Sequence, residues 1–107
     1  MVNRDLRTEL KVKGEALAGL CRKYDVDRLD VFGSGATDAW HPGESDLDFI
    51  VAFRPLPGSG LADRYLGLAD DLELLFGRPV DLLTENAIRN PYFRQSVEAT
   101  RATVYAA

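Results

Sequence analysis

Two short stretches decide the fold: VFGSGAT at residues 31–37 and SDLDFIV at residues 45–51. In the first, Gly33 and Ser34 follow an apolar strand candidate and open a segment, 34–39, that we expect to form a short helical turn. A turn between a strand and a helix presents backbone N–H groups and the positive end of a helix dipole to an anion. Glycine also lets a phosphate approach the backbone closely. The first stretch therefore predicts a phosphate-binding turn.

The second stretch places two carboxylates at the start of a strand. Asp46 and Asp48 are two residues apart, and residues i and i+2 of a strand point to the same face of the sheet. Two negative groups about 7 Å apart along a strand repel each other unless a cation lies between them. Mg²⁺ takes oxygen ligands of this kind together with substrate phosphates. The alternative is a polar strand entrance covered by water, which the apolar run at 49–51 directly after Asp48 disfavours.

A third carboxylate, Asp81, lies in the apolar strand candidate at 80–84. A lone acid in a strand otherwise composed for burial needs a partner. One candidate partner is Arg78 or another arginine, in a salt bridge. The other is the Asp46–Asp48 pair, if the two strands lie side by side. Three carboxylates can hold two metal ions, and a pair of metal ions commonly catalyses in-line displacement at phosphorus.

Hydrophobic periodicity and turn signals predict the remaining elements. The expected helices are an amphipathic helix over 5–24, a helix over 61–76 ended by Gly77 and Pro79, and a helix over 92–101 that follows Asn90-Pro91. The expected strands are 28–32, 47–53, 80–84 and a short terminal strand at 103–106. Helices alternate with strands, so the expected class is α/β (α+β), with helices packed against a small mixed sheet of three to four strands.

Composition excludes several classes of function. The chain has 107 residues, 13 Lys+Arg against 17 Asp+Glu, and a formal net charge of −4. This length predicts a single domain, 1–107. No apolar run approaches the roughly 20 residues of a membrane span, and the N-terminus lacks an apolar signal core. Cys21 is the one cysteine, which excludes an internal disulfide. We expect a cytoplasmic protein that binds neither membranes nor, because its charge is acidic, nucleic acid directly.

The Gly33-Ser34 turn followed by Asp46-Leu47-Asp48 resembles the signature of the polymerase-β-type nucleotidyltransferase superfamily. The short length and the strand-borne Asp81 resemble its minimal (MNT) branch, over essentially the whole chain. The resemblance implies ATP as substrate and two Mg²⁺ ions as cofactors. It implies that all three acids are catalytic and bind metal, that Asp81 is also the general base, and that the turn binds the triphosphate. Many members carry an arginine where this chain has Thr37, which can donate one hydrogen bond to a phosphate but carries no charge.

The resemblance also implies a partner. Minimal nucleotidyltransferases of this kind are often antitoxins of HEPN-domain toxin ribonucleases, and some transfer AMP from ATP to a toxin tyrosine. The implied function is Mg²⁺-dependent transfer of AMP to a hydroxyl of a HEPN-type partner, in a homo- or hetero-oligomer. A domain of this size has room for little beyond a catalytic half-site, so a protein substrate would supply the rest. Two alternatives stay open: an antitoxin or nucleotide-binding module that acts by occlusion without catalysis, and a transferase for a small molecule or an RNA end.

Overall fold

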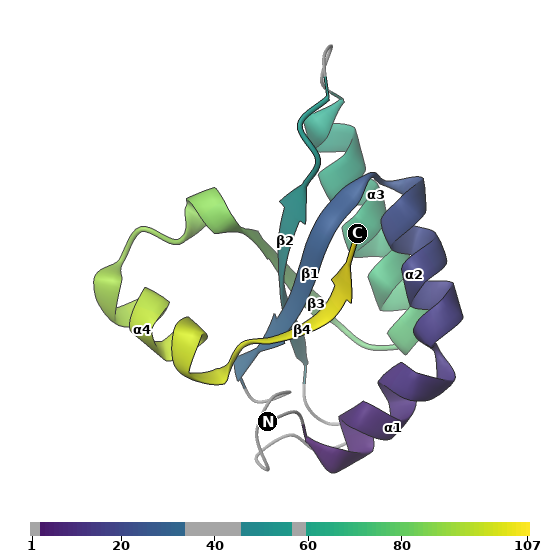
Figure 1. The fold of residues 1–107 in the computed structure, drawn as a ribbon, viewed down its shortest axis with the longest axis horizontal. Helices are drawn as coiled ribbons and strands as arrows, with labels where there is room; N and C mark the ends of the chain where they lie inside the picture. The colour runs from purple at the N-terminus through teal and green to yellow at the C-terminus, as the bar shows by residue number, and fades with distance from the viewer. Residues whose placement is uncertain (1–2, 34–45, 57–59) are drawn as a thin grey trace.

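The structure is a computed structural model that describes residues 3–33, 46–56 and 60–107. In these ranges the helices are α1 (Arg4–Val12), α2 (Gly14–Lys23), α3 (Leu61–Phe76), the short 3-10 turn η2 (Glu85–Ala87) and α4 (Pro91–Thr100). The strands are β1 (Val26–Phe32), β2 (Leu47–Phe53), β3 (Val80–Thr84) and β4 (Ala102–Ala106). Figure 1 shows their arrangement. No helix in the described ranges is long and apolar enough to cross a membrane.

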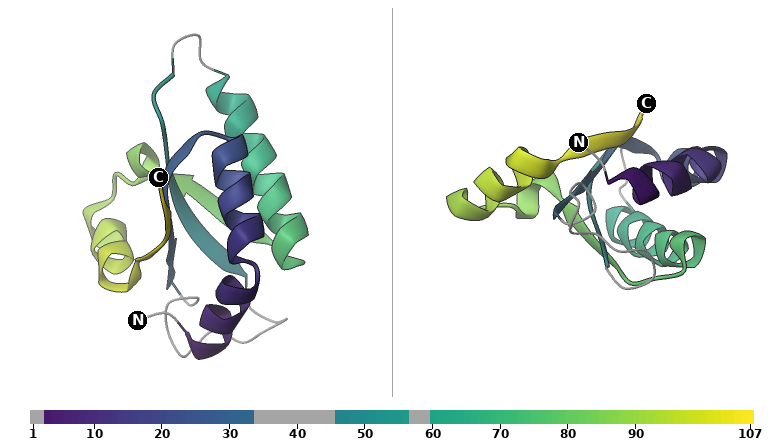
Figure 2. Two further views of the ribbon diagram at one scale, coloured as in Figure 1. Left: turned by 45° about the vertical axis from the view of Figure 1, so that its right-hand side comes forward. Right: turned by 90° about the horizontal axis from the view of Figure 1, so that it is seen from below.

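The four strands form one mixed sheet in the order β3-β2-β1-β4. Strand β1 is antiparallel to both β2 and β4, whereas β2 and β3 are parallel. A parallel pair needs a crossover connection, and α3 supplies it. Helices α1, α2 and α3 cover one face of the sheet, and α4 covers the other (Figure 2). This architecture confirms the expected fold class.

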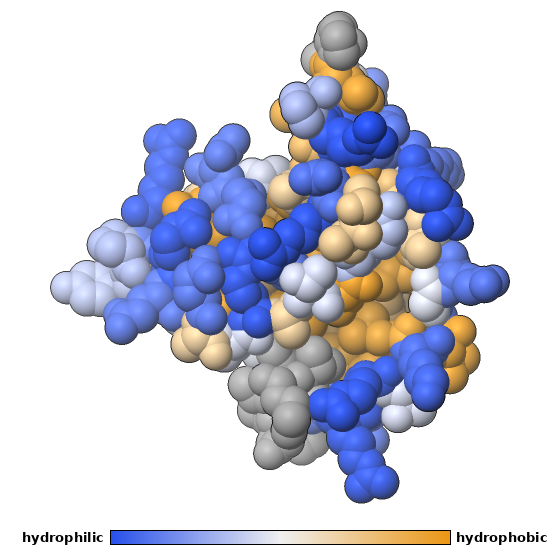
Figure 3. Space-filling model, in the orientation of Figure 1, coloured by the Kyte–Doolittle hydropathy of each residue, from blue (hydrophilic) through white to orange (hydrophobic). Residues whose placement is uncertain are grey.

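Alternation along the strands supplies a core on each face. Toward α2 and α3, the strands bury residues such as Leu29, Val31 and Phe49. Toward α4, the buried residues are Phe32, Ile50, Ile88 and Val97. The surface over α4 and η2 is mostly hydrophilic, and apolar side chains gather where β4 meets α1 and α2 (Figure 3).

The single helix predicted over 5–24 is wrong, because the chain breaks into α1 and α2 at Lys13. This residue has φ −94° and ψ 9°, and the following Gly14 is a weak helix former. The Lys13 ammonium donates hydrogen bonds to Glu9 Oε1 and to the Leu75 carbonyl oxygen, both at 2.9 Å. The break therefore lets Lys13 satisfy a carbonyl at the end of α3.

The other predicted elements are confirmed within two residues at their ends. Strands β2 and β3 and helix α3 begin and end as expected. Gly77 ends α3 with φ +65°, a conformation that glycine adopts without strain. The Asn90 side chain accepts hydrogen bonds from the N–H groups of Tyr92 and Phe93 and so begins α4. The helical turn expected at 34–39 lies outside the described residues.

A buried carboxylate, Asp30, ties β1 to the end of α4. Asp30 is fully buried and pairs with Arg28 at 2.8 Å and with Arg101 at 2.7 Å. Arg101 also pairs with Glu85 and Glu98. Burial raises the pKa of Asp30, but hydrogen bonds from Arg28 and Arg101 outweigh it and leave that pKa below its usual value. This network fixes the residue directly after α4 onto the sheet.

We predict that Asp30→Asn destabilises the fold by about 3 kcal/mol, because it breaks a buried ion pair and leaves Arg101 under-compensated. The pKa of Asp30 is lowered in the fold, so its contribution is present above its unfolded pKa and is lost as the pH falls below about 4. Urea unfolding between pH 3 and 7 measures both effects. The matched control is Asp27→Asn, an exposed acid on the same strand. Equal stability of the two variants at pH 7 would contradict the prediction.

Candidate functional site

The sheet register brings the predicted acids together. Parallel pairing sets Asp48 of β2 directly opposite Asp81 of β3, and antiparallel pairing sets Phe32 of β1 opposite Asp48. Directly opposed residues project from the same face of a sheet. Because Phe32 packs in the core beneath α4, Asp48 and Asp81 belong to the α4 face. Asp46 precedes Asp48 by two residues, at the entrance of β2.

Within the described part of the chain, the three acids form a region of negative charge without a compensating cation. Asp48 is half-buried, whereas Asp46 and Asp81 are exposed. Burial raises the pKa of Asp48, and the neighbouring carboxylates of Asp81 and Asp46 raise it further. No ion pair within residues 3–33, 46–56 and 60–107 involves any of the three. Arg78, the alternative partner for Asp81, pairs with Glu9 of α1 at 3.1 Å.

This charge fits a divalent cation that is shared with a substrate. Among the described residues, no three Asp, Glu, His or Cys side chains are grouped closely enough to hold a metal ion by themselves. Mg²⁺, however, is typically bound by one or two carboxylates plus substrate phosphates and water. The adjacent Asp48 and Asp81, with Asp46 nearby, could provide the protein's share of such a site, and a bound cation would offset their charge.

Gly33 lies against Asp48 at the end of β1. Its φ is +69°, and a Cβ atom at this position would lie 2.7 Å from Asp48 Oδ2. The turn therefore favours glycine, because L side chains rarely adopt this backbone conformation and a Cβ atom would force the Asp48 carboxylate to move. The N–H group of Gly33 donates to Thr100 Oγ1 at 3.0 Å. Because Gly33 has no side chain, a ligand could come close to its backbone beside Asp48. The N–H group of Gly33 itself is hydrogen-bonded to Thr100 of α4.

Two other predicted phosphate-binding residues, Ser34 and Thr37, lie outside the described residues. Thr100 is the contact that the sequence analysis missed. It lies 67 residues from Gly33 along the chain. A threonine in the last turn of an expected helix does not by itself indicate a hydrogen bond to such a distant residue.

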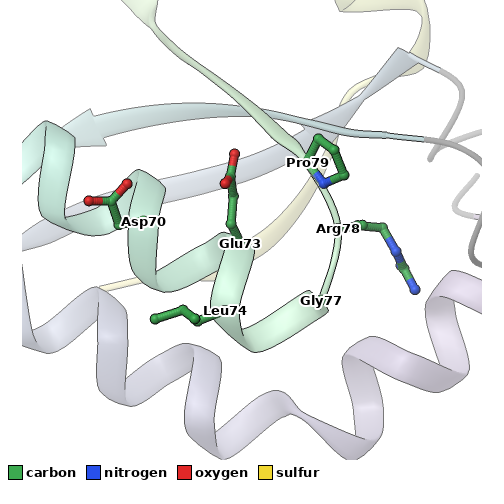
Figure 4. Close-up of a pocket in the computed structure, with 6 residues that line it drawn as sticks. All are labelled: Asp70, Glu73, Leu74, Gly77, Arg78 and Pro79. Atoms are coloured by element: carbon green, nitrogen blue, oxygen red, sulfur yellow. The ribbon is translucent and has the colours of Figure 1, made fainter.

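A hollow at the end of α3 lies beside the turn that leads into β3 (Figure 4). Its lining residues are Asp70, Glu73, Leu74, Gly77, Arg78 and Pro79. Glu73 Oε1 accepts a hydrogen bond from the N–H of Val80, the first residue of β3, at 3.2 Å. Arg78 projects the other way, to Glu9. Glu73 of this hollow therefore helps to hold the turn that positions β3 next to β2.

Comparison with known proteins assigns the fold to a family. The family model described as "Nucleotidyltransferase domain" matches residues 14–103. The chain belongs to this family. Two proteins of Methanocaldococcus jannaschii, both named "putative protein adenylyltransferase", are 38% identical over 76 residues and 37% identical over 79 residues. The matches cover 71% and 74% of this chain, and 74% and 76% of those proteins.

Solved structures place the nucleotidyltransferase domain among minimal nucleotidyltransferases. One structure described as a minimal nucleotidyltransferase shares 34% identity at a TM-score of 0.67, covering 91% of this chain and 93% of that one. A chain of a toxin–antitoxin complex with AMP-PNP shares 21% identity at a TM-score of 0.62, with coverages of 87% and 73%. A chain of a complex between a tri-AMPylated Shewanella oneidensis HEPN toxin and an MNT antitoxin shares 18% identity at 0.58, with coverages of 92% and 73%. The last two likenesses show a shared fold.

We predict that Gly33→Ala weakens nucleotide binding and also destabilises the nucleotidyltransferase domain. The left-handed conformation alone costs a non-glycine residue about 1–2 kcal/mol, and the new methyl group would displace the Asp48 carboxylate. Gly77→Ala is the matched control, because Gly77 has φ +65° with nothing within 4 Å of its Cβ position. Thermal melts and ATP titrations of both variants separate backbone strain from the clash with Asp48. Equal ATP affinity of the two variants would contradict the prediction.

We predict that Asp48→Asn stabilises the domain in the absence of ligands. Burial of the Asp48 carboxylate, and then repulsion from Asp81 and Asp46, raise its pKa, so removing the charge at pH 7 relieves both costs. Each kcal/mol relieved raises Tm by roughly 4–8 °C in a domain of this size. Adding Mg²⁺ and ATP should raise the Tm of the wild type and leave that of Asp48→Asn unchanged. A lower Tm for Asp48→Asn than for the wild type without ligands would contradict the account.

Proposed function

We propose that this nucleotidyltransferase domain transfers AMP from ATP to a hydroxyl group of a HEPN-type partner protein, with Mg²⁺ as cofactor. The observation that carries the proposal is the side-by-side placement of Asp48 and Asp81 without a compensating cation among the described residues. The names of the 37–38% identical relatives support adenylyl transfer to protein.

Each proposed site residue has a separate task. Asp46, Asp48 and Asp81 would hold two Mg²⁺ ions, which when bound neutralise phosphate charge and polarise the reacting oxygens. Gly33 leaves room for the nucleotide next to Asp48, and Ser34 and Thr37 would donate hydrogen bonds to its phosphates. Asp81 would act as general base toward the acceptor hydroxyl.

The proposed reaction is an in-line displacement at the α-phosphorus of ATP. The acceptor hydroxyl oxygen forms a bond to the α-phosphorus, and the bond from that phosphorus to the oxygen bridging to the β-phosphate breaks. The hydroxyl proton passes to the Asp81 carboxylate, and pyrophosphate leaves. Asp81 suits this task because it is exposed on an edge strand of the sheet, where an acceptor can approach it.

A HEPN-type acceptor is supported by the structural neighbours. Chains with the same fold occur in HEPN toxin–MNT antitoxin complexes, and one of these toxins is AMPylated. The exposed position of Asp81 at the sheet edge also suits an acceptor side chain presented by another protein. We therefore propose a hetero-oligomer with such a partner.

The proposal is tested by incubating the domain with labelled ATP, Mg²⁺ and a purified HEPN toxin. We expect label on the toxin from the wild type, and a loss of at least about 100-fold in rate for Asp46→Asn, Asp48→Asn or Asp81→Asn, because each removes one carboxylate from the charge-stabilising site. The matched control is Asp70→Asn, an exposed acid of α3, which should keep the wild-type rate.

The result also separates the two alternatives. Protection of cells from the toxin by Asp48→Asn at the wild-type level would show neutralisation by occlusion. Label that appears only in small molecules, with none on the toxin, would assign a small-molecule acceptor. If neither the toxin nor any small molecule is labelled, and the wild type gives the same result as Asp48→Asn, the proposed activity is overturned.

A further inference from the structure

We propose that Thr100, the last residue of α4, is a positioning residue for nucleotide binding, and that it acts by holding Gly33 against Asp48. The inference rests on the proposed function, because it names a residue that supports that same site. Thr100 lies on the helix that covers the acids' face of the sheet, whereas the predicted acids lie on β2 and β3 or directly before β2.

The Thr100 hydroxyl has the geometry of a fixed acceptor. Its oxygen lies 3.2 Å from the Ser96 carbonyl oxygen and 3.4 Å from that of Val97, so its one hydrogen donates back into the helix. A hydroxyl has two lone pairs in addition to its donor. One of these accepts the Gly33 N–H at 3.0 Å. The helix therefore orients the hydroxyl, and the hydroxyl orients the backbone of Gly33.

The position of Gly33 in turn sets the space beside Asp48. A methyl group added to Gly33 would lie only 2.7 Å from Asp48 Oδ2, so no atom separates the Gly33 backbone from the carboxylate. A shift of this backbone would change the room that a phosphate or metal finds there. Thr100 thus acts on Asp48 through Gly33.

The end of α4 is held firmly enough to serve as this support. Helix ends fray unless side chains tie them down, and the next residue, Arg101, is paired with the fully buried Asp30 at 2.7 Å and with Glu85. Toward the other end of the helix, Phe93 packs edge-on against Phe32 at 6.1 Å between ring centroids. Figure 2 shows α4 on this face of the sheet, across the strands from α1, α2 and α3.

The test compares Thr100→Val, Thr100→Ser and Thr8→Val with the wild type. Valine keeps the shape of threonine and removes the acceptor, whereas serine keeps the acceptor. Thr8 is the matched control, because its hydroxyl makes the same bond to the carbonyl four residues earlier, that of Arg4, on the exposed surface of α1. Two readouts are taken on the full chain: hydrogen exchange of the Gly33 amide, and the Kd for ATP in the presence of Mg²⁺.

We expect Thr100→Val to lose protection of the Gly33 amide and to raise the Kd for ATP about five- to tenfold, the effect of one hydrogen bond. Thr100→Ser should restore both, and Thr8→Val should match the wild type. Loss of amide protection with an unchanged Kd would overturn the positioning role, while leaving the proposed function intact. If the wild type binds no ATP, both the proposed function and the positioning role of Thr100 are overturned. The ATP titration of the wild type identifies this outcome without any variant. A raised Kd that serine does not rescue would also overturn the positioning role.

Discussion

The carboxylates of Asp48 and Asp81, held opposite each other by parallel strands, are the constraint on which the rest of the site depends. Burial of Asp48 raises the pKa of its carboxyl, and repulsion from the neighbouring carboxylates of Asp81 and Asp46 raises it further. The fold tolerates this cost because its larger core lies on the opposite face of the sheet, beneath α2 and α3, and the ion pairs around Asp30 do not involve Asp48. Such local destabilisation is common where a site must bind a charged ligand.

The crossover through α3 fixes the register that creates this pair. Its end is held by Lys13, which donates to the Leu75 carbonyl, and by Glu73, which accepts from the first N–H of β3. The Leu47 N–H then donates to the Pro79 carbonyl oxygen at 3.2 Å, which starts the pairing of β2 with β3. A slip of one residue would turn Asp81 to the other face of the sheet. The turn after α3 is therefore part of the functional architecture, although it lies outside the site itself.

Local signals in the sequence were sufficient for most of the fold. The apolar run after Asp48 predicted β2, and Gly77 predicted the end of α3, because both depend on neighbours along the chain. The break at Lys13 was not predicted from Gly14 alone, because the carbonyl that Lys13 satisfies there belongs to a helix distant in sequence. The meeting of Asp48 with Asp81 was predicted only conditionally, on the two strands being adjacent, and the structure supplies that adjacency. The hydrogen bond from Gly33 to Thr100 joins residues far apart along the chain, so no local sequence pattern indicates it.

We propose that the carboxylates at the starts of β2 and β3 form a metal site that the nucleotide completes. Paramagnetic broadening of backbone amide signals tests for this site when Mn²⁺ is added to the isotope-labelled domain with ATP. The account predicts selective broadening at Phe32, Gly33, Asp48 and Asp81, stronger with ATP than without it, and lost in Asp48→Asn. Broadening that is spread over exposed acids such as Asp63 and Asp70, or that does not depend on ATP and Asp48, would contradict it.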